Sequence, residues 1–186
     1  MANIILGECK DACSLPTLSL APTPTIWKAS PSGFFKINVN GTALDDGRPS
    51  RIGVIIRDCQ GSPIAASSRT LPAAFSAEIT EAMALQEGVL LAAEMGISRA
   101  IFETDALSTI QATNEGDLGG ELGHIIQNIK DISSSFSWCT FQHLKRSGNR
   151  ATHELAKAAR ISGVSQVWKG VSPSFVEHVI LEERGM

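Results

Sequence analysis

The stretch Lys36-Ile37-Asn38-Val39-Asn40-Gly41 decides the fold of this chain. Apolar residues at 35, 37 and 39 alternate with polar residues at 36, 38 and 40, which is typical of a strand with one face in a core. Gly41 and the Asp45-Asp46-Gly47 cluster end the pattern. Taken alone, Asn40-Gly41 is more typical of a turn than of a functional site.

The elements that follow this strand predict a mixed sheet. Tight turns separate the strand at 35–40 from strands at 52–56 and 63–70, which indicates an antiparallel meander. The later elements are expected as a helix at 76–95 capped by Ser76, a strand at 100–103, helices at 105–113 and 121–134, a strand at 136–143 and a helix at 149–161. A meander followed by strand–helix alternation predicts the α/β class, with a five-stranded mixed sheet flanked by helices.

Three segments are expected along the chain. Residues 1–26 carry scattered prolines without a sustained period and indicate an N-terminal tail or linker. Residues 27–162 should form the folded domain, and residues 163–186 a C-terminal extension.

Composition limits the protein class. The chain has 186 residues, of which 43% are hydrophobic and 19% are charged, an ordinary globular balance. It contains no apolar run of 18 residues, so we expect no transmembrane helix and no membrane partner. Its first residues do not form a secretory signal. The interpretation is an intracellular protein, located in the nucleus or cytoplasm.

The net charge is −3, whereas nucleic-acid binders are usually more basic. The distribution is uneven, however, because basic residues dominate the stretch from His143 to Arg160. That stretch contains Lys145, Arg146, Arg150, Lys157 and Arg160 against the single acidic residue Glu154. The excess favours an anionic partner, and a solvated helix face is the alternative.

Glu81 is the carboxylate that the helical pattern singles out. Its neighbours at helical spacing are small or apolar, namely Ala77, Ala84, Leu85, Gly88 and Ala92. A carboxylate on such a stripe needs a partner or a metal ion, because burial disfavours its charge. The alternative is a carboxylate at the rim of the stripe that reaches water. Glu87 and Glu94 fall on the opposite side of the helix and are expected to be solvated.

Asn40, Glu81 and Asp105 occur where strands and helix should converge. Two-metal phosphodiester cleavage needs several carboxylates aimed at one point, with two divalent cations roughly 4 Å apart. Taken alone, Asp105 is better explained as the N-cap of the helix that follows it. Only the order and context of the three residues favour a joint site.

Several motifs occur in a fixed order along residues 27 to 180. They are Trp27-Lys28, the stretch 36–41, the stretch Gly53 to Asp58, the stretch Glu81 to Leu85, Glu103-Thr104-Asp105, the stretch Arg146 to Ala156, and Val167-Trp168 followed by Pro173-Ser174-Phe175. Each motif is weak alone, but the ordered set resembles the ribonuclease H-type domain of the plant retroelement-derived, reverse-transcriptase-associated family. The resemblance implies a ribonuclease H-like fold.

The resemblance also implies a catalytic set. Active members of the family cleave the RNA strand of RNA–DNA hybrids with Mg²⁺ or Mn²⁺ held by carboxylates. Glu81 and Asp105 match two of these metal ligands. Asn40 occupies the first-strand position, where the family has Asp, and His153 occupies the last-helix position, where many ribonucleases H have Asp and this plant group commonly has His. Because Mg²⁺ prefers anionic oxygen, we expect Asn40 to impair catalysis. His153 on the surface of its helix, without a role in the site, is the alternative.

The expected function is therefore a ribonuclease H-like, nucleic-acid-binding domain, monomeric and catalytically impaired. Its partner would be an RNA–DNA hybrid or another nucleic acid, contacted through Lys145, Arg146, Asn149 and Arg150. One alternative is an active Mg²⁺-dependent hybrid ribonuclease. The other is a protein-interaction or fossil domain without a nucleic-acid role, which the acidic net charge favours.

Overall fold

Strand β1 (Phe35–Thr42) forms where the alternating pattern predicts it and lies inside the sheet. The structure is a computed structural model that describes residues 26–116 and 119–185, so all but the last residue of the predicted tail 1–26 lies outside the described residues. Strand β1 pairs antiparallel with β2 (Arg51–Arg57) and parallel with β4 (Arg99–Thr104). Its apolar residues Ile37 and Val39 are fully buried, and so is Asn38 between them.

The sheet has six strands in the order β5-β4-β1-β2-β3-β6, with β3 at Pro63–Thr70, β5 at Trp138–His143 and β6 at Gln166–Lys169. The mixed α/β class is confirmed, and the predicted count of five strands is short by β6. Strand β6 has only four residues and is mostly exposed, so it offers too few positions for an alternating pattern. Its pairing with β3 is antiparallel and defines the outer edge of the sheet.

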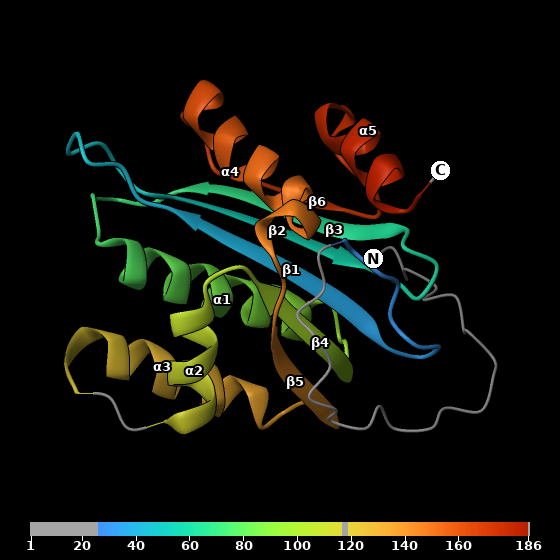
Figure 1. Ribbon diagram of the computed structural model, residues 1–186, viewed down its shortest axis with the longest axis horizontal. Coiled ribbons are helices and arrows are strands. Elements are labelled where there is room, and N and C mark those ends of the chain that lie inside the picture. Colours follow the sequence, from blue (N-terminus) through green and yellow to red (C-terminus); the bar gives the residue numbers. More distant parts are fainter. Residues whose placement is uncertain (1–25, 117–118, 186) are drawn as a thin grey trace.

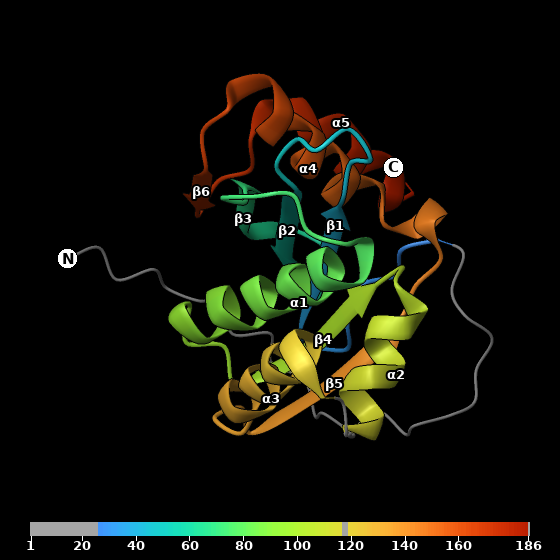
Figure 2. The same cartoon turned by 90° about the vertical axis from the view of Figure 1, so that its left-hand side faces the viewer.

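Helices cover both faces of the sheet (Figure 1). On one face lie α1 (Ala77–Glu94), α2 (Leu107–Glu115) and α3 (Gly120–Ser133), and on the other lie α4 (Arg150–Ser162) and α5 (Ser174–Glu183). Figure 2, turned by 90°, shows the sheet between these two layers. A short 3-10 helix, η1 (Arg146–Gly148), leads from β5 into α4. None of the helices in the described ranges is both long and apolar enough to cross a bilayer.

Helix α1 begins as predicted, with the Ser76 side chain accepting a hydrogen bond from the Ile79 amide at 3.3 Å. The expectation for Glu87 is wrong, because its carboxylate accepts a hydrogen bond from Ser67 at 3.2 Å and pairs with Arg69 on strand β3. Glu94 is largely exposed as expected, and it forms an ion pair with Lys169. Helix α1 therefore contacts the sheet through Glu87 as well as through its apolar stripe.

Two glycines allow the helices to lie close to the sheet. A Cβ atom at Gly53 of β2 would lie 2.1 Å from the Thr152 carbonyl oxygen of α4. A Cβ atom at Gly88 of α1 would lie 2.5 Å from a methyl carbon of Val39 in β1. Both distances are shorter than real contacts, so these positions require glycine. These close approaches seat the second half of α1 on β1 and the first turns of α4 on β2.

The C-terminal residues fold onto this framework. Strand β6 extends the sheet, and α5 packs on α4 through Val176, Val179 and Ile180, which form an apolar cluster with Ala151 and Leu155. Residues 163–185, predicted as an extension, thus supply part of this apolar cluster.

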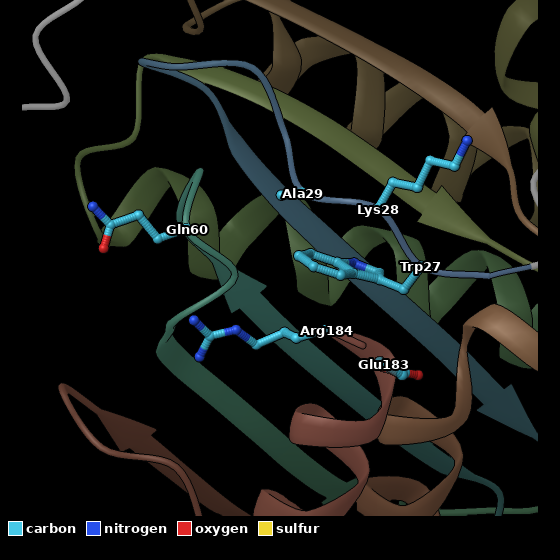
Figure 3. Close-up of a pocket in the computed structure, with 6 residues that line it drawn as sticks. All are labelled: Trp27, Lys28, Ala29, Gln60, Glu183 and Arg184. Carbon is cyan, nitrogen blue, oxygen red and sulfur yellow. The ribbon is translucent and has the colours of Figure 1, made fainter. Parts of the chain in front are cut away.

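A buried ion pair joins α5 to the sheet. Arg57 of β2 is fully buried, and its Nη1 atom donates to Glu183 Oε2 at 2.7 Å while Nη2 donates to Asn38 Oδ1 at 3.0 Å. The Trp27 ring lies 4.0 Å from the Arg57 guanidinium carbon. The other oxygen of Glu183 accepts hydrogen bonds from the backbone amides of Arg150 and Ala151 at the start of α4. Figure 3 shows Trp27 together with Glu183, which is the last residue of α5. Both side chains line a cavity of about 340 Å³.

Replacing Glu183 by alanine should lower the free energy of unfolding by about 3–5 kcal/mol, because a buried guanidinium loses its counterion. The matched control is Glu182→Ala, which removes an ion pair to Arg150 whose side chains are 53% and 51% exposed, and should cost less than about 1 kcal/mol. Urea denaturation of both variants measures the difference. Equal losses would mean that the Arg57–Glu183 pair does not hold α5 in place.

Candidate active site

Strands β1 and β4 run parallel, so their carboxyl ends meet at the same edge of the sheet. Asn38 of β1 is in register with Glu103 of β4, and Asn38 Nδ2 donates to Glu103 Oε2 at 3.0 Å. These two side chains therefore share one face. Asn40 lies near the carboxyl end of β1, and Asp105 directly follows the carboxyl end of β4.

Glu81 reaches this edge from helix α1. Gly41 lets the helix approach, because a Cβ atom there would lie 2.6 Å from the Thr80 carbonyl group. The Gly41 amide donates a hydrogen bond to Glu81 Oε2 at 2.9 Å. Burial raises the pKa of Glu81 to about 7, a rise that this hydrogen bond opposes. The partner that the Glu81 carboxylate needs on this apolar stripe is thus the backbone amide of Gly41 in β1.

Asp105 faces the site and does not cap α2, so the N-cap interpretation is wrong. The residue before α2 is Ala106, and no side chain caps this helix. The Asp105 carboxylate accepts a hydrogen bond from Asn149 Nδ2 at 2.8 Å, and its other oxygen lies 3.3 Å from His153 Nε2. Burial alone would raise the pKa of Asp105, but the interactions with His153 and Asn149 outweigh it and hold that pKa below its ordinary value.

His153 lies one turn into α4, and its side chain is 17% exposed. Its Nε2 atom lies beside the Asp105 carboxylate, so His153 is not an isolated surface residue, and its role in the site stays a prediction. The sequence carries no signal for this contact beyond the motif itself, because the two residues are brought together only by the packing of α4 on the sheet.

Asn149 was expected to contact nucleic acid, but it is fully buried. Its Nδ2 atom donates to the Val39 carbonyl oxygen at 2.9 Å as well as to Asp105. Asn149 therefore joins the ends of β1 and β4 to the start of α4, and its role is to position Asp105. The other expected contacts, Lys145, Arg146 and Arg150, are exposed at the surface beside the site.

Asn40 is buried, with 1% of its surface exposed, and its Nδ2 atom donates to Thr42 Oγ1 at 3.1 Å. It brings a neutral amide where the site needs negative charge. Within residues 26–116 and 119–185, no three Asp, Glu, His or Cys side chains come together in a way that could hold a metal ion. Asp105 is engaged by Asn149 and His153, and with a pKa raised to about 7 Glu81 is only partly ionised near neutral pH. This donor set does not fit a two-Mg²⁺ centre.

Comparisons with known proteins agree with this geometry. The sequence profile of the reverse transcriptase-like family matches residues 38–159. The structure is similar to RNase H1 from the archaeon Halobacterium salinarum NRC-1, with a TM-score of 0.64 and 16% sequence identity over 69% of this chain and 98% of that one. It is also similar to the N-terminal RNase H domain of a Mycobacterium tuberculosis protein, with a TM-score of 0.63 and 17% identity over 70% of this chain and 99% of that one.

A third structure, LC11-RNase H1 from a compost metagenome, was solved in complex with an RNA/DNA hybrid. It gives a TM-score of 0.63 and 19% identity over 69% of this chain and 98% of that one. Comparison with curated proteins gave no match. At these identities the structures establish a shared ribonuclease H-like fold.

The raised pKa of Glu81 predicts a pH-dependent stability. Between about pH 4.5 and pH 7 the folded chain binds more protons than the unfolded chain at this group, so the contribution of Glu81 to stability falls as the pH rises. From about pH 5 to about pH 8, the wild type should lose roughly 2 kcal/mol relative to Glu81→Gln, which does not titrate. Urea denaturation at the two pH values measures this loss, and parallel pH profiles for both proteins would contradict it.

Proposed function

Because this chain belongs to the reverse transcriptase-like family, we propose that it is a nucleic-acid-binding ribonuclease H-like domain with impaired hydrolysis. The matched residues 38–159 include Asn40, Glu81, Asp105 and His153, together with the basic residues that precede α4. The proposed ligand is an RNA–DNA hybrid, for which the complex of LC11-RNase H1 offers the precedent. We further propose a plant retroelement-derived origin, a monomeric state and an intracellular location in the nucleus or cytoplasm.

The buried, neutral Asn40 is the observation that carries the proposal of impairment. Two divalent cations bring four positive charges together, and Glu81 and Asp105 offer at most two negative charges. Asn40 adds none, because its only possible ligand atom is a neutral carbonyl oxygen. The repulsion between two cations is therefore poorly compensated, which disfavours the arrangement that ribonuclease H chemistry requires.

An active Mg²⁺-dependent hybrid ribonuclease is the second candidate, supported by Glu81 and Asp105 at the same edge of the sheet. Metal-dependent cleavage of a labelled hybrid separates it from the impaired domain. A protein-interaction or fossil domain without a nucleic-acid role is the third, and it predicts no hybrid affinity at all. Measuring both cleavage and binding on one preparation therefore distinguishes the three.

Asn40→Asp should gain at least trace cleavage of an RNA–DNA hybrid with Mg²⁺ or Mn²⁺, while the wild type shows little or none. The added carboxylate supplies the missing negative charge near the carboxyl end of β1. A gel assay on a labelled hybrid measures the cleavage, and Glu81→Gln combined with Asn40→Asp should abolish any gain.

The control for that experiment concerns the Asn40-Gly41 pair, which is prone to deamidation. Partial conversion of Asn40 to Asp in an aged sample would mimic weak activity, so fresh protein of verified intact mass is required. Robust cleavage by fresh wild type that is lost in Glu81→Gln would show that Asn40 does not impair the enzyme.

Removing the charges of Arg146 and Arg150 should weaken hybrid binding for every sequence tested. Phosphate contacts release counterions, so the slope of log affinity against log salt should flatten by up to about 2. The matched control removes Lys130 of α3 and Lys169 of β6, which lie on elements away from the site. Fluorescence anisotropy over a salt series measures both slopes. Unchanged affinity and slope in the arginine variant would exclude this surface as the contact.

A further inference from the structure

A second polar cavity adjoins the candidate active site. It has a volume of about 290 Å³ and lies between η1, α4 and α5. Its lining consists of Arg146, Ser147, Arg150, His153, Glu154, His178 and Val179. His153, which contacts Asp105, forms part of its wall, so the cavity opens next to the proposed hydrolytic centre.

Several side chains that line this cavity carry hydrogen-bond donors. Two guanidinium groups and two imidazole rings line it from three elements. Arginine forks and imidazole N–H groups match the oxygens of a phosphate group, which accepts several charge-assisted hydrogen bonds at once. The volume is at the low end for small-molecule sites and suits a phosphate or pyrophosphate group with its waters.

The acidic groups nearby do not cancel this character. Glu154 lies 3.6 Å from Lys157, and Arg150 pairs with Glu182 at 2.8 Å, both among exposed side chains whose pairs are weak. Arg146 forms no ion pair within the described part of the chain, and its positive charge extends to Glu81, whose pKa it lowers against the effect of burial. A phosphate group would therefore meet at least one uncompensated guanidinium.

The wall supplied by α5 is held rigidly against α4. Glu183 accepts hydrogen bonds from the Arg150 and Ala151 amides while its other oxygen binds the buried Arg57. Val179, which lines the cavity, is buried in the apolar cluster between the two helices. His178 is thus presented from a fixed surface, and little conformational entropy is lost when a ligand binds.

We propose that this cavity is a phosphate-binding subsite in which His178 of α5 acts together with Arg146 and Arg150. Helix α5 lies outside residues 38–159, so His178 is not part of the segment that the family profile matches. The phosphate would come either from a nucleic-acid backbone, which rests on the proposed function, or from free pyrophosphate, which does not.

The test compares His178→Ala with His124→Ala, an equally exposed histidine on α3 on the opposite face of the sheet. Inorganic pyrophosphate and an RNA–DNA hybrid are titrated separately, with NMR shifts of the imidazole signals and fluorescence anisotropy as readouts. We expect His178→Ala to weaken both affinities roughly 3- to 10-fold, in line with the loss of a hydrogen bond to a charged group, and His124→Ala to change neither.

The outcomes separate the subsite from the proposed function. Pyrophosphate that shifts the His178 signal and binds His178→Ala roughly 3- to 10-fold more weakly supports the subsite even where the hybrid does not bind, in which case the proposed function fails alone. Hybrid binding that is unchanged in His178→Ala while pyrophosphate binding weakens supports a subsite for free pyrophosphate and excludes the nucleic-acid backbone as its ligand. Pyrophosphate that shifts no signal of His178, or that binds His178→Ala as tightly as the wild type, overturns the subsite and leaves the proposed function standing.

Discussion

The buried guanidinium of Arg57 is the group around which the described structure is organised. A charge in this position is tolerated only with a counterion and hydrogen-bond acceptors, and it obtains them from Glu183 of α5 and Asn38 of β1. Because Glu183 also holds the first amides of α4, the same carboxylate sets the start of the helix that carries His153. The position of the candidate active site thus depends on an interaction between residues 126 positions apart.

The charge distribution of the candidate site includes a neutral residue, Asn40, near the carboxyl end of β1. With a neutral Asn40, Asp105 finds its partners within the protein, in Asn149 and His153. Glu81 is left with a backbone amide and a pKa near neutrality. Asp105 thus has partners within the protein, and Glu81 is partly protonated near neutral pH. The proposed phosphate contacts, Arg146 and Arg150, lie on the adjacent exposed surface, so the proposed nucleic-acid binding would not require these carboxylates to change partners.

The parts of this fold that could be predicted from sequence are those with local signals. Alternation defines β1, Ser76 marks the start of α1, and the apolar stripe marks Glu81 as a residue that needs a partner. Strand β6 could not be predicted, because four residues carry too little periodicity.

The site residues were predictable to a smaller extent. Asp105 was placed in the site only by the order of the motifs; taken alone it indicated a helix cap, because the local pattern reveals nothing about the α4 side chains that reach it. Asn149 was assigned to the surface because its two acceptors, Val39 and Asp105, are distant in sequence. The role of Glu183 leaves no sequence signal at all, since its partner Arg57 is 126 positions away in the sequence. In physical terms, local propensity and periodicity are encoded in neighbouring residues, whereas partner choice is determined by tertiary packing.

The convergence of Trp27 and Glu183 on Arg57 has a consequence for the architecture of larger proteins. One cavity is lined by residues 27–29 and by residues 183 and 184, so the first and last segments of the described part of the chain lie side by side (Figure 3). A unit with adjacent ends can be inserted into a surface loop of a host protein, or circularly permuted through a short linker, with little distortion of either partner. The contacts of Trp27 and Glu183 with Arg57 therefore also hold these two segments together, which suits the described part of the chain to insertion or permutation.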